Sequence, residues 1–284
     1  SELASGLASR PVRPSTKSQF INKLTEKSKP MKRTAIITGA SSGIGRQMAI
    51  DLDLRGFDTV LVARREERLK KLASELRHNT EVFECDLSKK EECFRLYEAY
   101  KDREDILVLI NNAGFGQVGF FDETPLDREL DMVDVNVRSV HILTKLFLRE
   151  FEARNKGYIL NVASTAGLLP AGPMMSTYYA TKSYVKSLTL AINEELAQKG
   201  SKVWVCTLCP GPVDTEFNEV ADASFSISGI SAEMCAKTAI REMFMRKLII
   251  VPGTAIKAGT VASRVIPTKV YLKAANSFQT KKVK

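Results

Sequence analysis

Short apolar runs alternate with longer amphipathic stretches from Lys32 to about Gly253, and this alternation restricts the fold more than any other feature. Apolar runs of this kind are typical of parallel strands that helices cover on both faces. A repeated order of strand, helix and strand favours right-handed crossovers and two helical layers. The chain is therefore predicted to be an α/β protein with a doubly wound parallel sheet of about seven strands flanked by helices.

The strands are expected at residues 34–38, 59–63, 81–84, 106–111, 158–163, 203–209 and 248–251. The helices are expected at residues 43–55, 66–77, 89–101, 126–154, 177–198 and 232–246. Neither an internal repeat nor a change of composition marks a boundary before Gly253. Residues 31–253 are therefore predicted to form one domain.

The formal net charge of +9 lies in the two ends of the chain, with +5 in residues 1–32, +7 in residues 257–284 and −3 between them. A nucleic-acid-binding domain carries its basic excess on a folded face, so we expect no nucleic-acid partner. Residues 1–30 are expected to be a flexible leader, or a remnant of protein production, before a start at Met31. Residues 254–284 are expected to be a basic amphipathic extension that Pro267 interrupts. This extension is open to lipid contact, to packing on a partner subunit or to capping of a substrate pocket, and we favour an ordinary surface element over membrane contact.

The five cysteines are scattered and odd in number, as in reduced intracellular proteins. No run of about 18 apolar residues and no secretory signal is present, which predicts a cytoplasmic protein. Cys206 and Cys209 form a C-x-x-C pair, but an offset of three within a strand places them on opposite faces. We interpret them as buried apolar residues, and predict no metal site.

The first predicted strand ends in a glycine-rich turn, T-G-A-S-S-G-I-G at residues 38–45, and an amphipathic helix follows. Gly39 permits the sharp turn, Gly43 lets a pyrophosphate approach the backbone, and Gly45 lets the helix pack on the strand. The free N–H groups at the start of the helix favour bound phosphate. The sheet is therefore predicted to be a Rossmann-type nucleotide-binding sheet whose cradle comprises Gly39, Ser41, Ser42, Gly43, Ile44 and Gly45.

The spacing T-G-x-x-x-G-x-G resembles that of the short-chain dehydrogenase/reductase family, over roughly residues 33–252. Fragments similar to family motifs recur in order at residues 111–114, 136, 164, 178–182 and 210–215. The resemblance implies hydride transfer between a nicotinamide cofactor and a carbonyl or secondary alcohol. It also implies a homodimer or homotetramer, paired through the helices expected at residues 126–154 and 177–198.

The end of the second predicted strand indicates which cofactor binds. An acid at this place accepts hydrogen bonds from the ribose 2′-OH of NAD, whereas arginine binds the 2′-phosphate of NADP. Ala63 takes the place of the acid and Arg64 follows it, so NADP(H) is predicted, with Arg65 as a second contact. In the alternative interpretation the two arginines merely begin a solvated helix.

The resemblance implies further cofactor contacts along the carboxyl edge of the sheet. Asp86, followed by Leu87, would accept from the adenine amine, with helix capping as the alternative. Asn112, Ala113 and Gly114 would lie against the adenosine ribose, while side-chain amides tie neighbouring strands. The backbone of the loop with Pro210, Gly211 and Val213 would meet the nicotinamide amide. Thr215 would touch that amide or the pyrophosphate.

Tyr178 and Lys182 are four residues apart, so that a helix presents them on one face. A neighbouring ammonium favours a phenolate, and Lys182 is therefore expected to lower the pKa of Tyr178 from its ordinary value of about 10. The resemblance implies that Tyr178 exchanges a proton with the substrate and that Lys182 also binds the nicotinamide ribose. It implies that Ser164 holds the substrate oxygen, and that Asn136 kinks its helix around a water that completes a proton relay. Tyr179 would point about 100° away from Tyr178 around the helix.

A loop near residues 211–232 is expected to cover the substrate. The expected pocket lining is apolar, and no arginine or lysine is forced into it: Phe115, Leu168, Leu169, Met174, Met175, Val213 and Phe217. For several of these residues a position in the core is the alternative. This lining predicts a hydrophobic carbonyl or alcohol substrate. A catalytically silent NADP(H)-sensing protein is the alternative, and a protein acting at membrane surfaces through its basic ends is a third hypothesis. The complete set of Asn136, Ser164, Tyr178 and Lys182 favours the enzyme.

Overall fold

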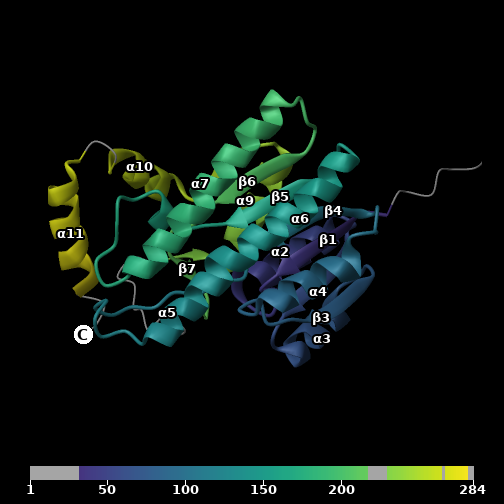
Figure 1. Ribbon diagram of the computed structural model, residues 1–284, viewed down its shortest axis with the longest axis horizontal. Coiled ribbons are helices and arrows are strands. Elements are labelled where there is room, and N and C mark those ends of the chain that lie inside the picture. The colour runs from purple at the N-terminus through teal and green to yellow at the C-terminus, as the bar shows by residue number, and fades with distance from the viewer. Residues whose placement is uncertain (1–31, 217–228, 264–265, 281–284) are drawn as a thin grey trace, which may run out of the picture. The chain divides into compact units, whose positions relative to one another are not determined.

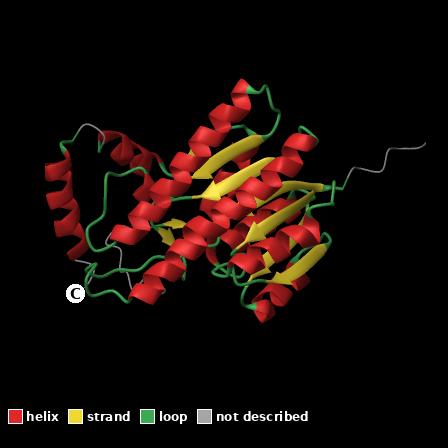
Figure 2. Ribbon diagram, in the orientation of Figure 1, coloured by secondary structure: helices red, strands yellow, loops and turns green. Residues whose placement is uncertain are grey.

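Seven parallel strands form one sheet in the order β3-β2-β1-β4-β5-β6-β9 (Figures 1 and 2). The computed structural model describes residues 32–216, 229–263 and 266–280, and the unit that begins at Arg33 is compact. The strands are β1 (Thr34–Thr38), β2 (Asp58–Ala63), β3 (Thr80–Glu84), β4 (Ile106–Asn111), β5 (Tyr158–Val162), β6 (Trp204–Leu208) and β9 (Ile249–Ile250). The predicted doubly wound parallel sheet is confirmed.

The central strands are mainly apolar because both faces of the sheet are buried there. Neighbouring residues of β1 illustrate this, since Ile36 and Ile37 are both fully buried but belong to two different core clusters. Helices α2 (Gly43–Leu54), α3 (Glu66–Glu75) and α9 (Ala232–Phe244) contribute to the cluster of Ile37. The cluster of Ile36 is completed by side chains of α4 (Lys90–Tyr100), α6 (Val140–Ala153) and α7 (Ser176–Gln198).

Polar side chains cross the carboxyl end of the sheet beneath the loops. The register of β4 and β5 pairs Asn111 with Asn161, and the Asn111 amide donates to Asn161 Oδ1 at 2.8 Å. The Asn161 amide donates in turn to Thr189 Oγ1 of α7 at 3.0 Å. Between β4 and β1, Asn112 Nδ2 donates to the carbonyl of Thr38 at 3.0 Å. The predicted tying of neighbouring strands by amides is therefore observed.

The helix expected at residues 126–154 is three consecutive segments: α5 (Leu126–Val133), the π-helical η1 (Asp134–Ser139) and α6. The other predicted helices and strands differ from the observed ones by at most two residues at either end, because end residues lack the full set of hydrogen bonds. Three short elements were not predicted: η2 (Thr165–Gly167) and the paired strands β7 (Val213–Asp214) and β8 (Ile230–Ser231).

The C-terminal extension forms two helices, α10 (Thr254–Ala262) and α11 (Thr268–Thr280). Pro267 directly precedes α11, in agreement with the predicted interruption. Figure 2 shows the strand arrowheads pointing toward the side on which these helices lie. Within the described ranges, no helix has both the length and the apolar character that crossing a membrane requires.

The two cysteines of the C-x-x-C pair are buried separately. Cys206 belongs to the same core cluster as Ile37, whereas Cys209 packs with Val140 and Val185. Burial raises the pKa of the Cys209 thiol to about 11, so this thiol stays protonated at neutral pH. Among the described residues, no three His, Cys, Asp or Glu side chains gather as metal ligands do.

Candidate active site

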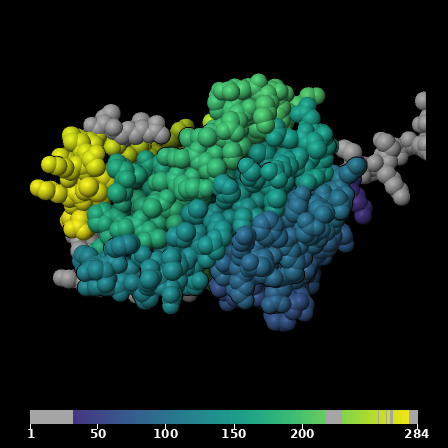
Figure 3. Space-filling view, viewed as in Figure 1, coloured from purple at the N-terminus to yellow at the C-terminus, as the bar shows by residue number. Residues whose placement is uncertain are grey.

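A cleft of about 940 Å³ lies at the carboxyl ends of the strands. Ligands of open α/β sheets bind at this edge because the loops that follow the strands converge there. Figure 3 shows the C-terminal segment, in yellow, packed beside green and teal segments at one end of the molecule. The predicted site residues that line the cleft are Gly39, Ser41, Ser42, Gly43, Ile44, Arg64, Arg65, Asp86, Leu87, Asn112, Ala113, Gly114, Ser164, Tyr178, Lys182, Pro210, Gly211, Val213 and Thr215.

The glycine-rich turn leaves room that any side chain would fill. Gly39 and Gly43 have φ angles of +66° and +53°, a conformation that glycine adopts without strain. A Cβ atom on Gly43 would lie 3.1 Å from Thr215 Cγ2, and one on Gly45 would lie 2.4 Å from the Gly39 carbonyl oxygen. Gly45 thus serves close packing, whereas Gly43 lies against Thr215, with both residues on the cleft wall.

Two arginines follow β2 at one end of the cleft. Arg64 is exposed, and it forms no hydrogen bond or ion pair within the described part of the chain. Arg65 reaches back over the glycine-rich turn, with Nη2 2.9 Å from Ser42 Oγ and 3.1 Å from Ser41 Oγ. The geometry therefore brings Arg65, predicted only as a second contact, closest to the turn.

Asp86 lies at the same end of the cleft, after β3. Its carboxylate accepts from the backbone N–H of Ser88 at 3.2 Å and from the Ser88 hydroxyl at 2.8 Å. Helix α4 begins only at Lys90, so these bonds order the loop before the helix without capping it. The carboxylate remains on the cleft wall, where an adenine amine is expected.

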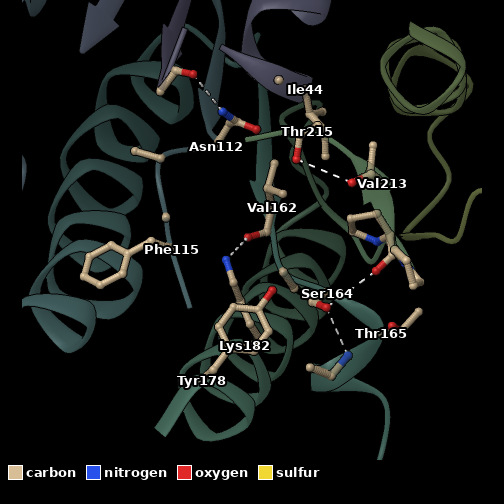
Figure 4. A pocket seen from close by; sticks show the side chains of 18 of the residues that line it. Ile44, Asn112, Phe115, Val162, Ser164, Thr165, Tyr178, Lys182, Val213 and Thr215 are labelled. Carbon is tan, nitrogen blue, oxygen red and sulfur yellow. Dashed lines mark hydrogen bonds between the residues drawn. The ribbon is translucent and has the colours of Figure 1, made fainter. Parts of the chain in front are cut away.

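Tyr178 and Lys182 lie one turn apart on α7 and are 8% and 4% exposed (Figure 4). Lys182 Nζ is 5.8 Å from the centre of the Tyr178 ring and donates to the carbonyl of Val162 at 3.0 Å. Burial lowers the pKa of the Lys182 ammonium to about 8. Because the ammonium is desolvated, Lys182 can gain or lose a proton near neutral pH.

Burial raises the pKa of the Tyr178 phenol to about 12, and its hydrogen bond with Ser164 opposes this shift. The predicted lowering of that pKa by Lys182 is absent from this arrangement, since Lys182 is bonded to Val162 and lies beside the ring. At neutral pH the phenol is therefore protonated. The phenol of Tyr178 can then donate its proton to an acceptor placed beside it.

Ser164 follows β5 and caps the short helix η2. Its hydroxyl accepts from the backbone N–H of Ala166 at 3.1 Å and approaches the carbonyl of Pro210 at 3.5 Å. Figure 4 shows Ser164 beside Tyr178, in the part of the cleft where Lys182 also lies. These contacts hold the Ser164 hydroxyl next to the phenol of Tyr178.

Asn136 is fully buried in the π-helical segment η1 and lies behind the cleft. Its amide accepts from the backbone N–H of Phe115 at 3.1 Å and donates to the Phe115 carbonyl at 2.9 Å. It also donates to Thr181 Oγ1 at 3.1 Å, which joins the loop after β4 to α7. The predicted kink corresponds to the π-helical turn. A Cβ atom on Gly114 would lie 2.8 Å from Asn136 Oδ1 and 3.2 Å from Lys182 Nζ, so Gly114 permits this convergence.

The substrate half of the cleft is mixed in character. Phe115, Leu169, Met175 and Val213 line it as predicted, while Phe217 and most of the predicted loop lie outside the described residues. For two residues the core alternative holds, because Leu168 packs against a core cluster with Val185 and Met174 lies within one with Met132.

The lining also includes a cation that was not predicted. Arg128 lines the cleft and stacks 4.1 Å from the ring centre of Phe115. Tyr179 lines the cleft as well, although a position 100° around α7 from Tyr178 suggested otherwise. Helix α5 and the loop after β4 meet only in the folded chain, so no local pattern could indicate Arg128.

Residues from the C-terminal extension complete the cleft wall. The lining includes Ile256, Gly259 and Thr260 of α10 and Tyr271, Ala274 and Ala275 of α11. Lipid contact, packing on a partner subunit and capping of the pocket were left open for the extension. The position of these residues agrees with capping of the pocket. The amphipathic character of the extension was visible in the sequence, but the cleft that it lines was not.

A sequence profile of the short chain dehydrogenase family matches residues 33–224. The very-long-chain 3-oxoacyl-CoA reductase of Anas platyrhynchos is 32% identical over 199 residues, which are 67% of this chain and 63% of that protein. This chain thus matches less than two thirds of the length of that relative.

Two solved structures with a similar fold have a nicotinamide cofactor bound. A short-chain dehydrogenase from Sphingobium yanoikuyae in complex with NADPH is 30% identical, with a TM-score of 0.75 over 81% of this chain and 91% of that one. A short-chain dehydrogenase/reductase from Burkholderia phymatum in complex with NAD is 27% identical, with a TM-score of 0.73 over 81% and 92%. Since the profile covers well over half of the chain and the motifs converge on one cleft, the protein belongs to the short-chain dehydrogenase/reductase family.

Proposed function

We propose that this protein is an NADP(H)-dependent oxidoreductase that transfers hydride between nicotinamide and a hydrophobic carbonyl or secondary alcohol. The observation that carries the proposal is the hydrogen bond between the buried Tyr178 and the half-buried Ser164, in the same cleft as the glycine-rich turn. A protein that only senses a nucleotide needs no such pair. The silent alternative therefore has no observation in its favour.

The cleft fits a dinucleotide along its length. Its glycine turn is open where Cβ atoms would intrude, Arg64 and Arg65 lie at one end, and Lys182 lies at the other. When bound, the cofactor supplies or accepts the hydride at its nicotinamide ring. In this proposal Lys182 holds the nicotinamide ribose and Thr215 holds the pyrophosphate.

Tyr178 and Ser164 act on the substrate oxygen in this proposal. A phenol with a pKa of about 12 is protonated at pH 7, so Tyr178 donates its proton to the oxygen of a carbonyl substrate. Ser164 donates a second hydrogen bond and stabilises the negative charge that develops on that oxygen. The protonated phenol is the form that reduction of a carbonyl requires.

Lys182 and Asn136 support this proton transfer. With a pKa of about 8, Lys182 can return a proton toward Tyr178 after each turnover. Asn136 acts as a positioning residue, because its amide fixes the Phe115 backbone against Thr181, one residue before Lys182. We therefore propose that Lys182, positioned with the help of Asn136, completes a proton relay to Tyr178.

The preference for NADP(H) rests on charge at the ribose end. Ala63 offers no carboxylate, while two guanidinium groups follow it. The similar Sphingobium enzyme binds NADPH and the Burkholderia protein binds NAD, so the family accommodates both cofactors. Arginine at this end favours the 2′-phosphate.

The substrate proposal rests on the wall formed by Phe115, Leu169, Met175 and the C-terminal helices. A largely apolar wall binds alkyl or ring substituents beside the reacting carbonyl. The duck relative is named for a long-chain acyl substrate, which is compatible with such a wall. We further propose residues 31–253 as the catalytic domain, with residues 254–284 as an extension that contributes to the pocket, in a cytoplasmic homo-oligomer.

The first test is Tyr178→Phe, which removes the phenolic proton and keeps the ring. We expect kcat for carbonyl reduction to fall by about 10²–10⁴-fold, the usual contribution of a general acid, while NADPH affinity changes less than about twofold. The matched control is Tyr179→Phe, which removes a neighbouring phenol in the same cleft and should retain most of the turnover. NADPH oxidation over a panel of hydrophobic ketones and aldehydes measures both. Unchanged turnover in Tyr178→Phe would overturn the assignment.

A further inference from the structure

An ion cluster that the sequence did not indicate lies at the ribose end of the cleft. Glu216 follows β7, and its Oε2 is 3.0 Å from Arg65 Nη1. Its second oxygen, Oε1, bonds to Nη1 of Arg68, one turn further along α3. One carboxylate thus bridges two guanidinium groups that lie about 150 residues earlier in the chain.

The opposite edge of Arg65 completes the arrangement. Its Nη2 lies within hydrogen-bond distance of both Ser41 and Ser42. Glu216, Arg65 and these two serines all line the cleft. The cluster is therefore part of the cofactor-binding wall and is continuous with the glycine-rich turn.

These groups match the chemistry of a phosphate site. Two guanidinium groups surround one anion, and two hydroxyl groups lie against Arg65, so the groups that bind phosphate oxygens are gathered here. Ion pairing with Arg68 and then Arg65 lowers the pKa of Glu216, so the carboxylate is charged at neutral pH. The anion in this set of donors is thus the carboxylate of the protein itself.

We infer that Glu216 determines how strongly the enzyme discriminates NADP(H) from NAD(H), because its carboxylate occupies the position of the 2′-phosphate and competes for Arg65 and Arg68. This inference rests on the proposed function. Binding of NADP(H) exchanges one anion for another on the two arginines, whereas NAD(H) leaves the pairs in place.

The size of the effect follows from exposure. The side chains of Arg65, Arg68 and Glu216 are 44%, 48% and 40% exposed. Ion pairs this accessible to water are weak, so the phosphate can displace the carboxylate. Glu216 therefore adjusts cofactor preference and does not abolish binding.

The experiment measures binding without turnover. Dissociation constants of NADPH, NADH, 2′,5′-ADP and 5′-ADP are determined for the wild type and for Glu216→Gln. We expect Glu216→Gln to bind NADPH and 2′,5′-ADP about threefold to tenfold more tightly, the range for removal of one exposed competing charge. NADH and 5′-ADP should change less than about twofold, since neither carries the 2′-phosphate.

Two further variants make the test specific. Glu233→Gln removes the same charge from an exposed ion pair with Lys237 on α9 and should leave all four constants unchanged. In an Arg68→Gln background, Glu216→Gln should improve NADPH binding by a smaller factor, because one of the contested guanidinium groups is gone.

Each result discriminates. An unchanged NADPH-to-NADH ratio in Glu216→Gln overturns the inference and leaves the proposed function standing. If Glu216→Gln lowers all four dissociation constants equally, the carboxylate was only a steric obstacle, and the inference is overturned. A change of the same size in Glu233→Gln overturns it as well. Failure of the wild type to bind either NADPH or NADH overturns both the inference and the proposed function.

Discussion

At the scale of single residues, the site depends on two buried groups whose protonation is displaced in opposite directions. Burial raises the pKa of the Tyr178 phenol and lowers that of the Lys182 ammonium, so both favour their uncharged forms. Ser164 and the carbonyl of Val162 each supply one hydrogen bond that opposes the loss of solvent. A bound cofactor and substrate would then meet a proton donor that is already in place.

The buried Lys182 predicts a pH dependence of stability. Its pKa is about 8 in the folded chain, against an ordinary value of 10.5 for the unfolded chain. Between these values the unfolded state binds more protons, so the stability that Lys182 contributes rises with pH and is lost as the pH falls through 8. The free-energy difference between wild type and Lys182→Met should shift in favour of the wild type by about 2 kcal/mol from pH 7 to pH 9.5.

Chemical denaturation at pH 7 and pH 9.5 measures this shift, below the range in which Tyr178 titrates. The exposed Lys199, which pairs with Glu152, provides the control variant Lys199→Met, for which no comparable shift is expected. Parallel pH profiles for the wild type and Lys182→Met would contradict the buried ammonium.

At the scale of elements, the junction of β1 and α2 combines two demands in one turn. Its backbone must adopt positive φ at Gly39 and Gly43, and its surface must stay open toward Thr215. The first demand concerns folding, because a side chain in this conformation strains the backbone. The second concerns ligand binding alone. Gly200, which also has a positive φ, allows the effect on folding to be separated from the effect on ligand binding.

Gly43→Ala and Gly200→Ala form the matched pair. Both glycines have positive φ, but a Cβ on Gly200 has nothing within 4 Å, whereas one on Gly43 meets Thr215. Each variant should lose about 1 kcal/mol of stability. Only Gly43→Ala should weaken NADPH binding, by about tenfold or more, because its methyl group projects into the cradle. Cofactor titration and thermal melting check both; equal binding losses would refute the role given to this turn.

At the scale of the whole molecule, the cleft gathers residues from almost the full length of the described chain, from Gly39 to Ala275. The sheet supplies the cofactor half through loops that follow β1, β2, β3 and β4. The substrate half depends on segments that are far apart in sequence, including Arg128 of α5 and Tyr271 of α11. Substrate preference can therefore change through α10 and α11 without any change in the catalytic residues.

Tyr271→Ala tests this separation of roles. Removing the ring from the cleft wall should raise KM for bulky hydrophobic carbonyl substrates by about tenfold, the loss expected from one apolar contact surface, with little change in NADPH affinity. Val270→Ala is the control, because its neighbouring side chain is 59% exposed and does not line the cleft. Steady-state kinetics with a short and a long ketone distinguish them, and equal KM values in all three proteins would exclude α11 from substrate binding.

The sheet could be predicted because its determinants are local. Parallel strands covered on both faces are apolar runs, and β1 and β4 were predicted with the bounds that the structure shows. The π-helical turn at Asn136 was expected only as a kink. Strands β7 and β8 have two residues each, too few for an apolar pattern to be visible.

The site was predictable as far as its motifs extend. The pair of Tyr178 and Lys182 is set by helical periodicity, and the glycine turn by backbone conformation. Glu216 was not predictable as a partner of Arg65, since 151 residues separate them. Which arginine approaches the turn also depends on side-chain rotamers, which a sequence pattern does not contain.

The hydrogen-bonded amides of Asn111 and Asn161 help to fix how β4 aligns with β5. A slip of one residue between β4 and β5 would turn every side chain of the slipped strand to the opposite face. The Asn111 amide would then lie among aliphatic side chains with its hydrogen bonds unmade, which destabilises such a structure by about 1–3 kcal/mol. A misaligned sheet is thus less stable than the native one, and the protein's own amides select the correct alignment without any ligand.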